Sequence, residues 1–280
     1  MDKVNLLDYR RDVYTSTGND GITEYIFKTI GVETGIFVEF GAWDGVRGCN
    51  CRKLFEQGWS GVFIEADDEK YANLCKNYEG QNRVHCCKAM VGFEDGSLFD
   101  RIVDPFLKGA NIDFCLIDID GLDLEVFETF EKYLPTVVCI EGGQMLDPLH
   151  ERLDTAVASK NIQQSLSVMV ESFEKKGYKV LCSYQDTYFI RAEFYDRFNV
   201  ASDLYELYFN GLAAIPKRIP YIQKKLKDAG LKNPIVNDIL WKSGFWRYGY
   251  RKRKLWAEKQ SPKIQAVIKE KYERTKSTVK

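Results

Sequence analysis

Several features that define large protein classes are missing from this 280-residue sequence. No apolar run approaches the roughly 18 consecutive residues of a membrane span. The N-terminus lacks the basic-then-apolar layout of a signal peptide, and there is no internal repeat or low-complexity segment. Cys49 and Cys51 have a C-x-C spacing, but no second cysteine pair or histidine lies at the distance of a zinc site. These absences argue against a membrane protein, a secreted protein, a repeat array and a zinc module.

Apolar residues are frequent enough to form a sizeable core. They make up 45% of the chain, and aromatic residues make up 14%, so a folded protein is expected. The length fits one α/β domain, or a domain of about 150–200 residues with an appendage. Five of the eight cysteines lie in apolar runs typical of buried strands, where cysteine acts as a small hydrophobe: Cys86, Cys87, Cys115, Cys139 and Cys182. We therefore expect free thiols and a reducing, cytoplasmic setting.

Charge is distributed unevenly along the chain. Residues 1–191 hold 20 basic and 32 acidic side chains, a net charge of −12, whereas residues 192–280 hold 20 basic and 9 acidic side chains, a net charge of +11. Such a shift marks a change of segment. We predict a domain over residues 1–194 and a basic, aromatic, helical extension over residues 195–280.

Short apolar runs alternate with helical patterns between about residues 20 and 190, which is typical of a parallel α/β sheet. Strands are expected at 35–42, 60–67, 82–92, 113–121 and 136–143, and helices at 18–31, 50–59, 68–79, 122–134 and 161–176, with Asn50 as a cap for the second helix. Two further runs, at 178–184 and 187–194, predict a closing antiparallel hairpin. The predicted fold is a Rossmann-like, doubly wound sheet of seven strands, with its ligand at the carboxyl ends of the strands.

After residue 195 the strand signals stop. Helices are expected at 202–212, 219–230 and 262–276, and residues 241–256 interleave lysine and arginine with aromatic residues. Such a basic aromatic tail can stack on nucleic acid, stack on sugar rings, lie at a membrane interface, or dock on an acidic surface. The opposite charges of the two segments favour docking within the chain or self-association between copies, and make nucleic acid the less favoured partner.

The turn over residues 39–45, Glu-Phe-Gly-Ala-Trp-Asp-Gly, follows the first predicted strand. It lacks the middle glycine of the G-x-G-x-x-G turn that holds a pyrophosphate. Its two carboxylates, Glu39 and Asp44, would repel phosphate at short range. They suit a cationic ligand, and S-adenosylmethionine carries an ammonium and a sulfonium. Gly41 would let the backbone pass closely under the methionine part of that molecule.

Glu65 ends the second predicted strand, 26 residues after Glu39. A carboxylate at this place can accept hydrogen bonds from both ribose hydroxyls, as the equivalent acid does in dinucleotide-binding folds. Acids at strand ends are also common without any ligand, and Glu39 can equally serve as a capping group. The pair of acids at this spacing and in this topology favours the cofactor role.

Several stretches of the sequence resemble the FkbM-type S-adenosylmethionine-dependent methyltransferases: residues 18–31, 37–71, 113–130, 137–143 and 187–193. The resemblance spans roughly residues 14–195 and is most specific in the first, second and fourth strands. It implies a methyltransferase sheet in which Asp118 lies beside the methionine part or the substrate. The implied cofactor-binding residues are Glu39, Gly41, Ala42, Asp44, Gly45, Glu65, Ala66 and Asp118.

The sequence departs from the family pattern in two places. Asp20 matches the family's segment before the first helix, but Ser16 stands where a glutamine is usual. Residues 142–154, after the fifth strand, also match poorly, and substrate choice is expected to reside there. The resemblance implies a sugar hydroxyl as acceptor, in a glycan, a glycolipid precursor or a secondary metabolite.

Carboxylates gather where the fourth and fifth predicted strands end. Asp118, Asp120 and Asp123 follow the fourth strand, and Glu141 ends the fifth. Asp118, Asp120 and Glu141 can therefore converge, and convergent oxygen ligands suit Mg²⁺ or Mn²⁺, which would position and acidify a hydroxyl. Asp120 and Asp123 can instead cap or begin the following helix, and this structural role is favoured for both. Asp118 is the favoured catalytic residue.

The sequence contains only two histidines, and both have structural alternatives. His150, in the loop after the fifth strand, is a candidate general base, although a lone histidine is more often structural. His85, entering the third strand, is expected to be structural.

The sequence as a whole predicts a cytoplasmic S-adenosylmethionine-dependent O-methyltransferase acting on a sugar hydroxyl, with metal assistance left open. RNA methylation is an alternative suggested by the basic tail and weakened because no Lys-Asp-Lys-Glu pattern is evident. A non-catalytic adaptor, with a vestigial cofactor fold and a partner-binding tail, is a second alternative from another class.

Overall fold

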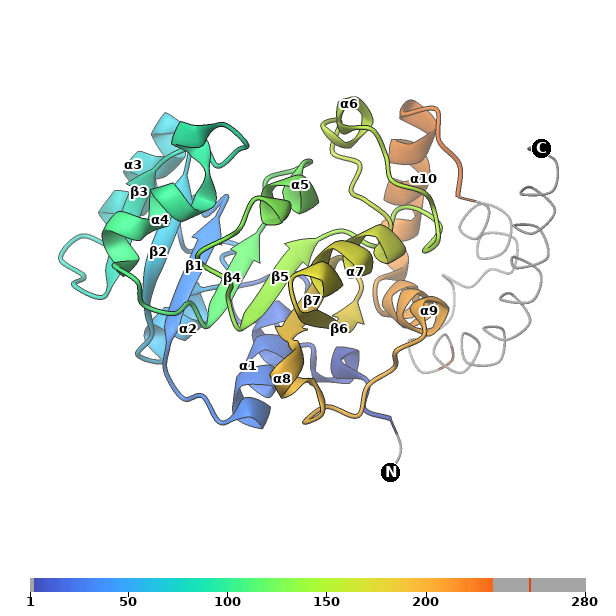
Figure 1. The fold of residues 1–280 in the computed structure, drawn as a ribbon, viewed down its shortest axis with the longest axis horizontal. Coiled ribbons are helices and arrows are strands. Elements are labelled where there is room, and N and C mark those ends of the chain that lie inside the picture. Colours follow the sequence, from blue (N-terminus) through green and yellow to red (C-terminus); the bar gives the residue numbers. More distant parts are fainter. Residues whose placement is uncertain (1–2, 234–251, 253–280) are drawn as a thin grey trace.

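The core of the protein is a seven-stranded sheet with helices on both faces (Figure 1). The computed structural model describes residues 3–233 and residue 252. Strand order is β3-β2-β1-β4-β5-β7-β6, with the first five parallel and β7 antiparallel to both of its neighbours. The strands are β1 (Ile36–Phe40), β2 (Ser60–Glu65), β3 (Val84–Lys88), β4 (Phe114–Ile117), β5 (Val137–Glu141), β6 (Tyr178–Ser183) and β7 (Asp186–Arg191). The predicted seven-stranded, Rossmann-like α/β fold with a closing hairpin is confirmed.

Helices fill most of the connections between strands. The α-helices are α1 (Asn19–Ile30), α2 (Arg52–Glu56), α3 (Asp68–Asn77), α4 (Phe99–Leu107), α5 (Asp123–Glu128), α6 (Thr155–Ala158), α7 (Leu166–Lys175), α8 (Ala192–Tyr195), α9 (Leu204–Ala214) and α10 (Ile219–Asp228). The 3₁₀ helices in the described part of the chain are η1 (Leu6–Tyr9), η2 (Asp95–Ser97) and η3 (Pro216–Arg218). Helix α4 lies in the connection from β3 to β4, where the sequence analysis predicted no helix.

Alternation along the strands divides the core into two hydrophobic clusters, one on each face of the sheet. In β1, Phe37 belongs to the cluster that includes α1 and α2, while Val38 and Phe40 belong to the cluster that includes α4, α5 and α7. Both faces of the central strands are therefore buried, which explains why their sequences are apolar almost without interruption.

Helix α1 forms as the sequence predicts. Ile22, Ile26 and Ile30 recur at four-residue spacing and are buried, and Gly31 ends the helix in the left-handed conformation at φ 76°. The predicted cap at Asn50 is wrong: α2 begins at Arg52, after Cys51, and has no side-chain cap of its own.

The helix predicted over residues 161–176 begins five residues later, at Leu166. Before it, Gln163 donates to Glu141 at 2.6 Å and Gln164 donates to Glu125 at 2.7 Å. These buried side-chain hydrogen bonds hold the segment against the sheet, where Ser165 forms an isolated bridge with Gly143. The local pattern indicated a helix, but long-range hydrogen bonds determine the conformation.

Helices α9 and α10 pack on the same core as the sheet. Asp203 caps α9 by accepting from the backbone N–H of Glu206 at 2.8 Å. Tyr208, Leu212 and Ile222 belong to the hydrophobic cluster that also contains residues of β4, β5 and α7. The first part of the proposed extension thus shares its core with the sheet. Most of the basic aromatic stretch 241–256 and the helix predicted at 262–276 lie outside the described residues.

All eight cysteines are free thiols. Cys115, Cys139 and Cys182 are buried in strands as predicted, whereas Cys86 and Cys87 are half-buried on β3. This fits the expected reducing compartment, which remains a prediction. Within the described part of the chain, no helix combines the length and the apolar character needed to cross a membrane.

If α9 belongs to the core, Leu212→Ala should lower the free energy of unfolding by about 2–5 kcal/mol, the usual cost of removing a fully buried leucine side chain. Leu212 is 0% exposed. Lys224→Ala, on the exposed surface of α10, serves as the control and should stay within about 0.5 kcal/mol of the natural protein. Urea denaturation measures both, and an equal, small effect would mean that α9 does not support the sheet.

Candidate active site

A cavity of about 870 Å³ lies at the carboxyl ends of the parallel strands. The strands β2 and β3 follow on one side of β1, and β4 and β5 follow on its other side, so the strand order reverses between β1 and β4. Ligands of doubly wound sheets bind at such a switch point. Residues at or just after the ends of β1 to β5 line much of the cavity, and Arg218 and Tyr221 reach it from the chain beyond the sheet. The lining includes Gly41, Trp43, Glu65, Ala66, Asp118, Asp120, Glu141, Gln185, Arg218 and Tyr221.

Gly41 brings the turn after β1 against the end of β4. It has φ 69°, in the left-handed region, and a Cβ placed on it would lie 2.1 Å from the carbonyl oxygen of Asp118. Only glycine fits this close backbone approach. Gly41, which the sequence analysis assigned to the cofactor turn, is therefore also required for the contact between this turn and the end of β4.

Glu65 faces the cavity from the end of β2, as expected. Its Oε2 accepts from the backbone N–H of Trp43 at 2.8 Å, and its Oε1 accepts from the backbone N–H of Asp67 at 2.9 Å. Each oxygen of an ionised carboxylate can accept about two hydrogen bonds. Glu65 is thus fixed in orientation, and the backbone contacts use about half of the acceptor capacity of its two oxygens.

Glu39 does not line the cavity. Its carboxylate is 2% exposed and accepts from the backbone N–H groups of Asn50 at 3.0 Å and Cys51 at 2.9 Å, and from the Cys49 thiol at 3.1 Å. Burial raises its pKa. Glu39 lies on the α1 and α2 face of β1 because it alternates with Val38 and Phe40. Glu39 therefore has the capping role that was its structural alternative. Its carboxylate accepts hydrogen bonds at the N-terminus of α2, where α2 has no side-chain cap of its own.

The remaining residues of the predicted cofactor turn, Ala42, Asp44 and Gly45, contact the turn and its neighbours and not the cavity. Asp44 accepts from the backbone N–H groups of Val46 and Arg47, both at 2.9 Å. A Cβ on Gly45 would lie 2.5 Å from the Tyr78 ring, so this glycine is needed for packing against α3. Ala42 is buried, and none of the three lines the cavity, whereas Gly41 and Ala66 do.

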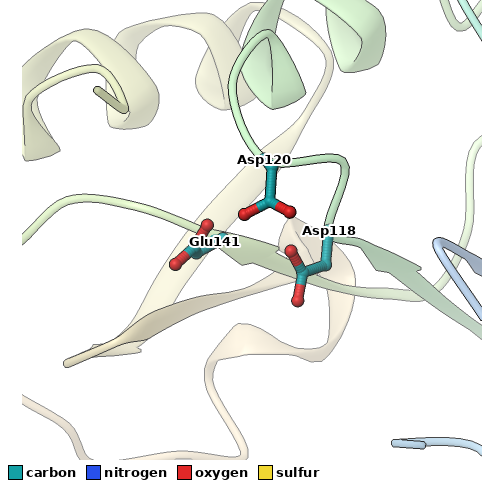
Figure 2. Close-up of side chains that lie close together, drawn as sticks. All are labelled: Asp118, Asp120 and Glu141. Atoms are coloured by element: carbon teal, nitrogen blue, oxygen red, sulfur yellow. The ribbon is translucent and has the colours of Figure 1, made fainter. Parts of the chain in front are cut away.

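Asp118, Asp120 and Glu141 converge at one edge of the cavity (Figure 2). One carboxylate oxygen from each lies within 4.8 Å of the others. The convergence predicted from the strand ends is therefore observed, but β4 ends at Ile117, and Asp120 sits in a turn at φ 61°.

Asp123 holds that turn in place. It is 1% exposed, and it accepts from the backbone N–H groups of Ile119 and Gly121, both at 2.9 Å. The expected structural role of Asp123 is observed in this form. Asp120 does not cap α5, which follows Leu122, but accepts from the side chain of Asn161 at 2.6 Å.

Arg218, from η3, reaches this acidic cluster, and the sequence analysis missed it. Its Nη2 donates to Oε1 of Glu141 at 3.1 Å, while Gln163 donates to Oε2 of Glu141 at 2.6 Å. The side chain comes from a segment 77 residues after its partner. No local motif marks it, because only the packing of α9 against the sheet brings η3 to the cavity.

Three acids that line or adjoin this part of the cavity, Asp118, Glu141 and Asp186, have raised pKa values. Loss of hydration, and then the charges of Glu141 and Asp120, raise the pKa of Asp118 to about 7. Burial, followed by the charge of Asp186, raises the pKa of Glu141 to about 7. Burial and the charge of Asp118 raise the pKa of Asp186, which follows Gln185, to about 7. Carboxyl groups with such values can exchange protons near neutral pH, as acid–base catalysts must.

The structure does not bring His150 to the cavity. His150 lines a separate hollow of about 320 Å³ with Arg152 and Glu171, and its Nδ1 lies 2.7 Å from the carbonyl oxygen of Glu151. His85 is exposed on β3, with its ring 5.2 Å from that of Phe106. Neither histidine is therefore placed to act on a ligand in the cavity.

Two aromatic rings form part of the cavity wall. Trp43, at φ 51°, is 57% exposed, and Nζ of Lys70 lies 4.8 Å from its ring. Tyr221, in α10, is 40% exposed, and the Arg218 guanidinium lies 5.2 Å from its ring. Large aromatic side chains left open in a cavity offer flat apolar surfaces to a ligand.

Comparison with known proteins yields no matching family model and no matching curated sequence. Among solved structures, the N-terminal domain of EvdMO1 with SAH bound is 15% identical, over 63% of this chain and 80% of its own, with a TM-score of 0.42. The same domain was crystallised in the presence of SAH and D-fucose. A SAM-dependent methyltransferase from Aquifex aeolicus is 12% identical, over 60% of this chain and 86% of its own, with a TM-score of 0.37.

The CurJ carbon methyltransferase is 8% identical, over 66% of this chain and 56% of its own, with a TM-score of 0.43. The chain is thus distantly similar in fold to solved structures that include S-adenosylmethionine-dependent methyltransferases. This similarity does not single out the FkbM type, and it carries no argument about substrate.

The close approach at Gly41 generates a stability prediction. Gly41→Ala should destabilise the protein by about 2 kcal/mol or more beyond the cost of the left-handed backbone alone, because the added Cβ would collide with the Asp118 carbonyl. Gly80→Ala is the matched control: Gly80 has φ 75° with nothing within 4 Å of the added Cβ, and its cost should be about 1–2 kcal/mol. Chemical denaturation compares the two, and equal losses would contradict the proposed contact.

Proposed function

We propose that this protein is an FkbM-type S-adenosylmethionine-dependent methyltransferase that transfers a methyl group to a hydroxyl oxygen. The observation that carries this proposal is the position of Glu65. Its carboxylate ends β2 and faces a cavity at the β1–β4 switch point, directly beside the turn at Gly41. A nucleoside ligand places its ribose hydroxyls at this point of a doubly wound sheet.

The charge of the cavity favours a cationic cofactor over a phosphorylated one. Asp118, Asp120 and Glu141 lie at one edge, and Glu65 lies at another part of the same lining. A pyrophosphate there would meet repulsion of several kcal/mol if it were partly desolvated. The sulfonium and ammonium of S-adenosylmethionine would be attracted instead. The volume of about 870 Å³ is within the range of small-molecule sites.

Methyl transfer to a hydroxyl is an in-line displacement at the sulfonium carbon. The acceptor oxygen forms a bond to the methyl carbon while the carbon–sulfur bond breaks, and the electron pair of that bond stays on sulfur. The hydroxyl proton must leave, and Asp118, with its pKa raised to about 7, is the carboxylate best placed to receive it. The cavity's task is to align oxygen, carbon and sulfur.

The proposed acceptor is a sugar hydroxyl, in a glycan or a glycolipid precursor. The resemblance in sequence supports this class, and the rings of Trp43 and Tyr221 on the cavity wall are suited to the apolar face of a sugar. Asp120 and Gln185 add polar groups to the same lining. Oriented hydrogen-bonding groups among flat apolar surfaces are typical of small-molecule sites.

A metal-assisted version of the same reaction has one observation in its favour. The carboxylate oxygens of Asp118, Asp120 and Glu141 lie within 4.8 Å of one another, and hard cations such as Mg²⁺ or Mn²⁺ bind such oxygens. These three residues would hold the ion, which would acidify the acceptor hydroxyl. However, Arg218 and Gln163 engage both oxygens of Glu141, and the Arg218 guanidinium already supplies positive charge there. The metal-free version is therefore preferred.

The two alternative functions make different demands on the molecule. RNA methylation draws on residues 241–256, most of which lie outside the described part of the chain. A non-catalytic adaptor would not need a cavity able to bind S-adenosylmethionine. Calorimetry with S-adenosylmethionine and with NAD separates the adaptor from both enzymes. If S-adenosylmethionine does not bind, the methyltransferase proposal is wrong.

Glu65→Ala should weaken binding of S-adenosylmethionine by about 1.5–3 kcal/mol, the scale of hydrogen bonds to a charged group. Isothermal titration calorimetry measures the change. Glu69→Ala, which removes the same side chain from an exposed position on α3, is the control and should leave binding unchanged. Circular dichroism checks that the backbone contacts of Glu65 do not unfold the protein. An unaltered dissociation constant in folded Glu65→Ala would place the cofactor elsewhere.

Asp118→Asn should abolish methyl transfer while leaving S-adenosylmethionine binding within about tenfold. The amide keeps the shape of the carboxylate but cannot accept the proton, and loss of a general base typically costs about 10²–10⁴ in rate. In the natural enzyme, kcat/KM should rise with pH as Asp118 loses its proton, with a midpoint near its pKa of about 7, and level off above it. A fully active Asp118→Asn enzyme would contradict this role.

Chelation separates the two versions of the chemistry. If EDTA has no effect on the natural enzyme, Asp118 receives the proton directly. If EDTA abolishes activity and Mg²⁺ or Mn²⁺ restores it, Asp118 and Glu141 act as metal ligands. In either case His150→Ala should remain active, because His150 lines a separate hollow.

A further inference from the structure

A second cavity, of about 540 Å³, adjoins the candidate active site. Gln185 and Arg218 line both cavities and therefore stand between them. The second cavity is built from the segment before α1, including Ser16 and Thr17, and from the chain around η3, including Lys217. Two segments 200 residues apart in sequence thus form a compartment that opens beside the acidic cluster.

The ionisable residues of this second cavity are mostly basic. Among the residues that the structure describes, Arg10, Lys217 and Arg218 line it, against a single acid, Asp12. Asp12 is engaged locally: its Oδ1 accepts from the backbone N–H of Gly18 at 2.5 Å and from the hydroxyl of Thr15 at 3.2 Å. Arg10 donates to the carbonyl oxygen of Ala214 at 3.0 Å, which fixes its guanidinium between the two segments.

The linings of the two neighbouring cavities therefore have net charges of opposite sign. Asp118, Asp120 and Glu141 gather in the first, and a cluster of basic side chains gathers in the second. Arg218 marks the boundary, because its Nη2 pairs with Glu141 while its side chain also lines the second cavity. A guanidinium carries five N–H donors, so one hydrogen bond to Glu141 does not exhaust its capacity to bind an anion.

We propose that the second cavity binds an acidic group of the acceptor, a carboxylate or a phosphate ester, while the acceptor hydroxyl lies in the first cavity. This inference rests on the proposed function and specifies the acceptor as an anionic molecule. The acidic cluster repels the charged end, and the basic compartment attracts it, so the two cavities together set the direction in which the acceptor enters. Ser16 supplies a hydroxyl group on the same wall, whereas the hydroxyl of Thr17 donates to Asp186 at 3.5 Å.

Three probes test the proposal on the full chain in the presence of S-adenosylhomocysteine: glucose, glucuronate and glucose 1-phosphate. Ligand-observed NMR titration gives each dissociation constant. Both anions, or one of them, should bind at least about fivefold more tightly than glucose, and this advantage should shrink at 0.5 M salt because exposed charges are screened. Comparison of the two anions distinguishes carboxylate from phosphate recognition.

Lys217→Glu reverses one charge in the second cavity, and Lys224→Glu makes the same change at an exposed position of α10 that lines neither cavity. Lys217→Glu should weaken the favoured anion by about three- to tenfold without changing glucose binding, and Lys224→Glu should have no effect on either. Equal affinity for the three probes, or equal losses in the two variants, would overturn the proposal.

S-adenosylmethionine affinity, measured on the same samples, keeps the two proposals apart. It should be unchanged in Lys217→Glu, which does not line the first cavity. Loss of the anion advantage with intact cofactor binding removes only the acceptor proposal. Failure of the natural protein to bind S-adenosylmethionine removes the proposed function and the acceptor proposal with it.

Discussion

The contact between Gly41 and the carbonyl of Asp118 is the constraint on which the candidate site depends. It holds the turn after β1 against the end of β4 at a separation that leaves no room for a side chain. The turn after β1 and the proposed catalytic carboxylate are thereby fixed to each other through the backbone. A parallel sheet places strand ends at a common edge, but this approach sets which atoms meet there.

Buried carboxylates hold three of the loops in the described part of the chain. Glu39 holds residues 49–51, Asp123 holds the turn at 119–121, and Asp20 accepts from the backbone N–H groups of Val13, Tyr14 and Thr15. Each gives several backbone donors a charged acceptor, which makes a loop rigid without a helix or strand. Acid-rich motifs in this chain thus have two kinds of role, and the hydrogen-bond partners distinguish them.

The sheet could be predicted from sequence because short apolar runs that alternate with helical patterns mark where each buried strand lies. The positions of Glu65, Asp118 and Glu141 followed from the same pattern, since each stands at or directly after the end of a strand. Glu39 was harder to assign, because both faces of β1 are buried and its apolar residues do not show which face carries the ligand. Arg218, Gln163 and the start of α7 could not be predicted, because they depend on contacts between segments far apart in the sequence.

The convergence of Asp118, Asp120 and Glu141 has a consequence for turnover. In the proposed reaction the bound cofactor loses its sulfonium charge when the methyl group departs, and the product is a neutral thioether at that atom. A cluster of carboxylates at one edge of the cavity attracts the cofactor more strongly than the product. The carboxylates that favour binding of S-adenosylmethionine therefore bind the demethylated product less tightly. In the proposed reaction this difference promotes release of the product and binding of the next S-adenosylmethionine molecule.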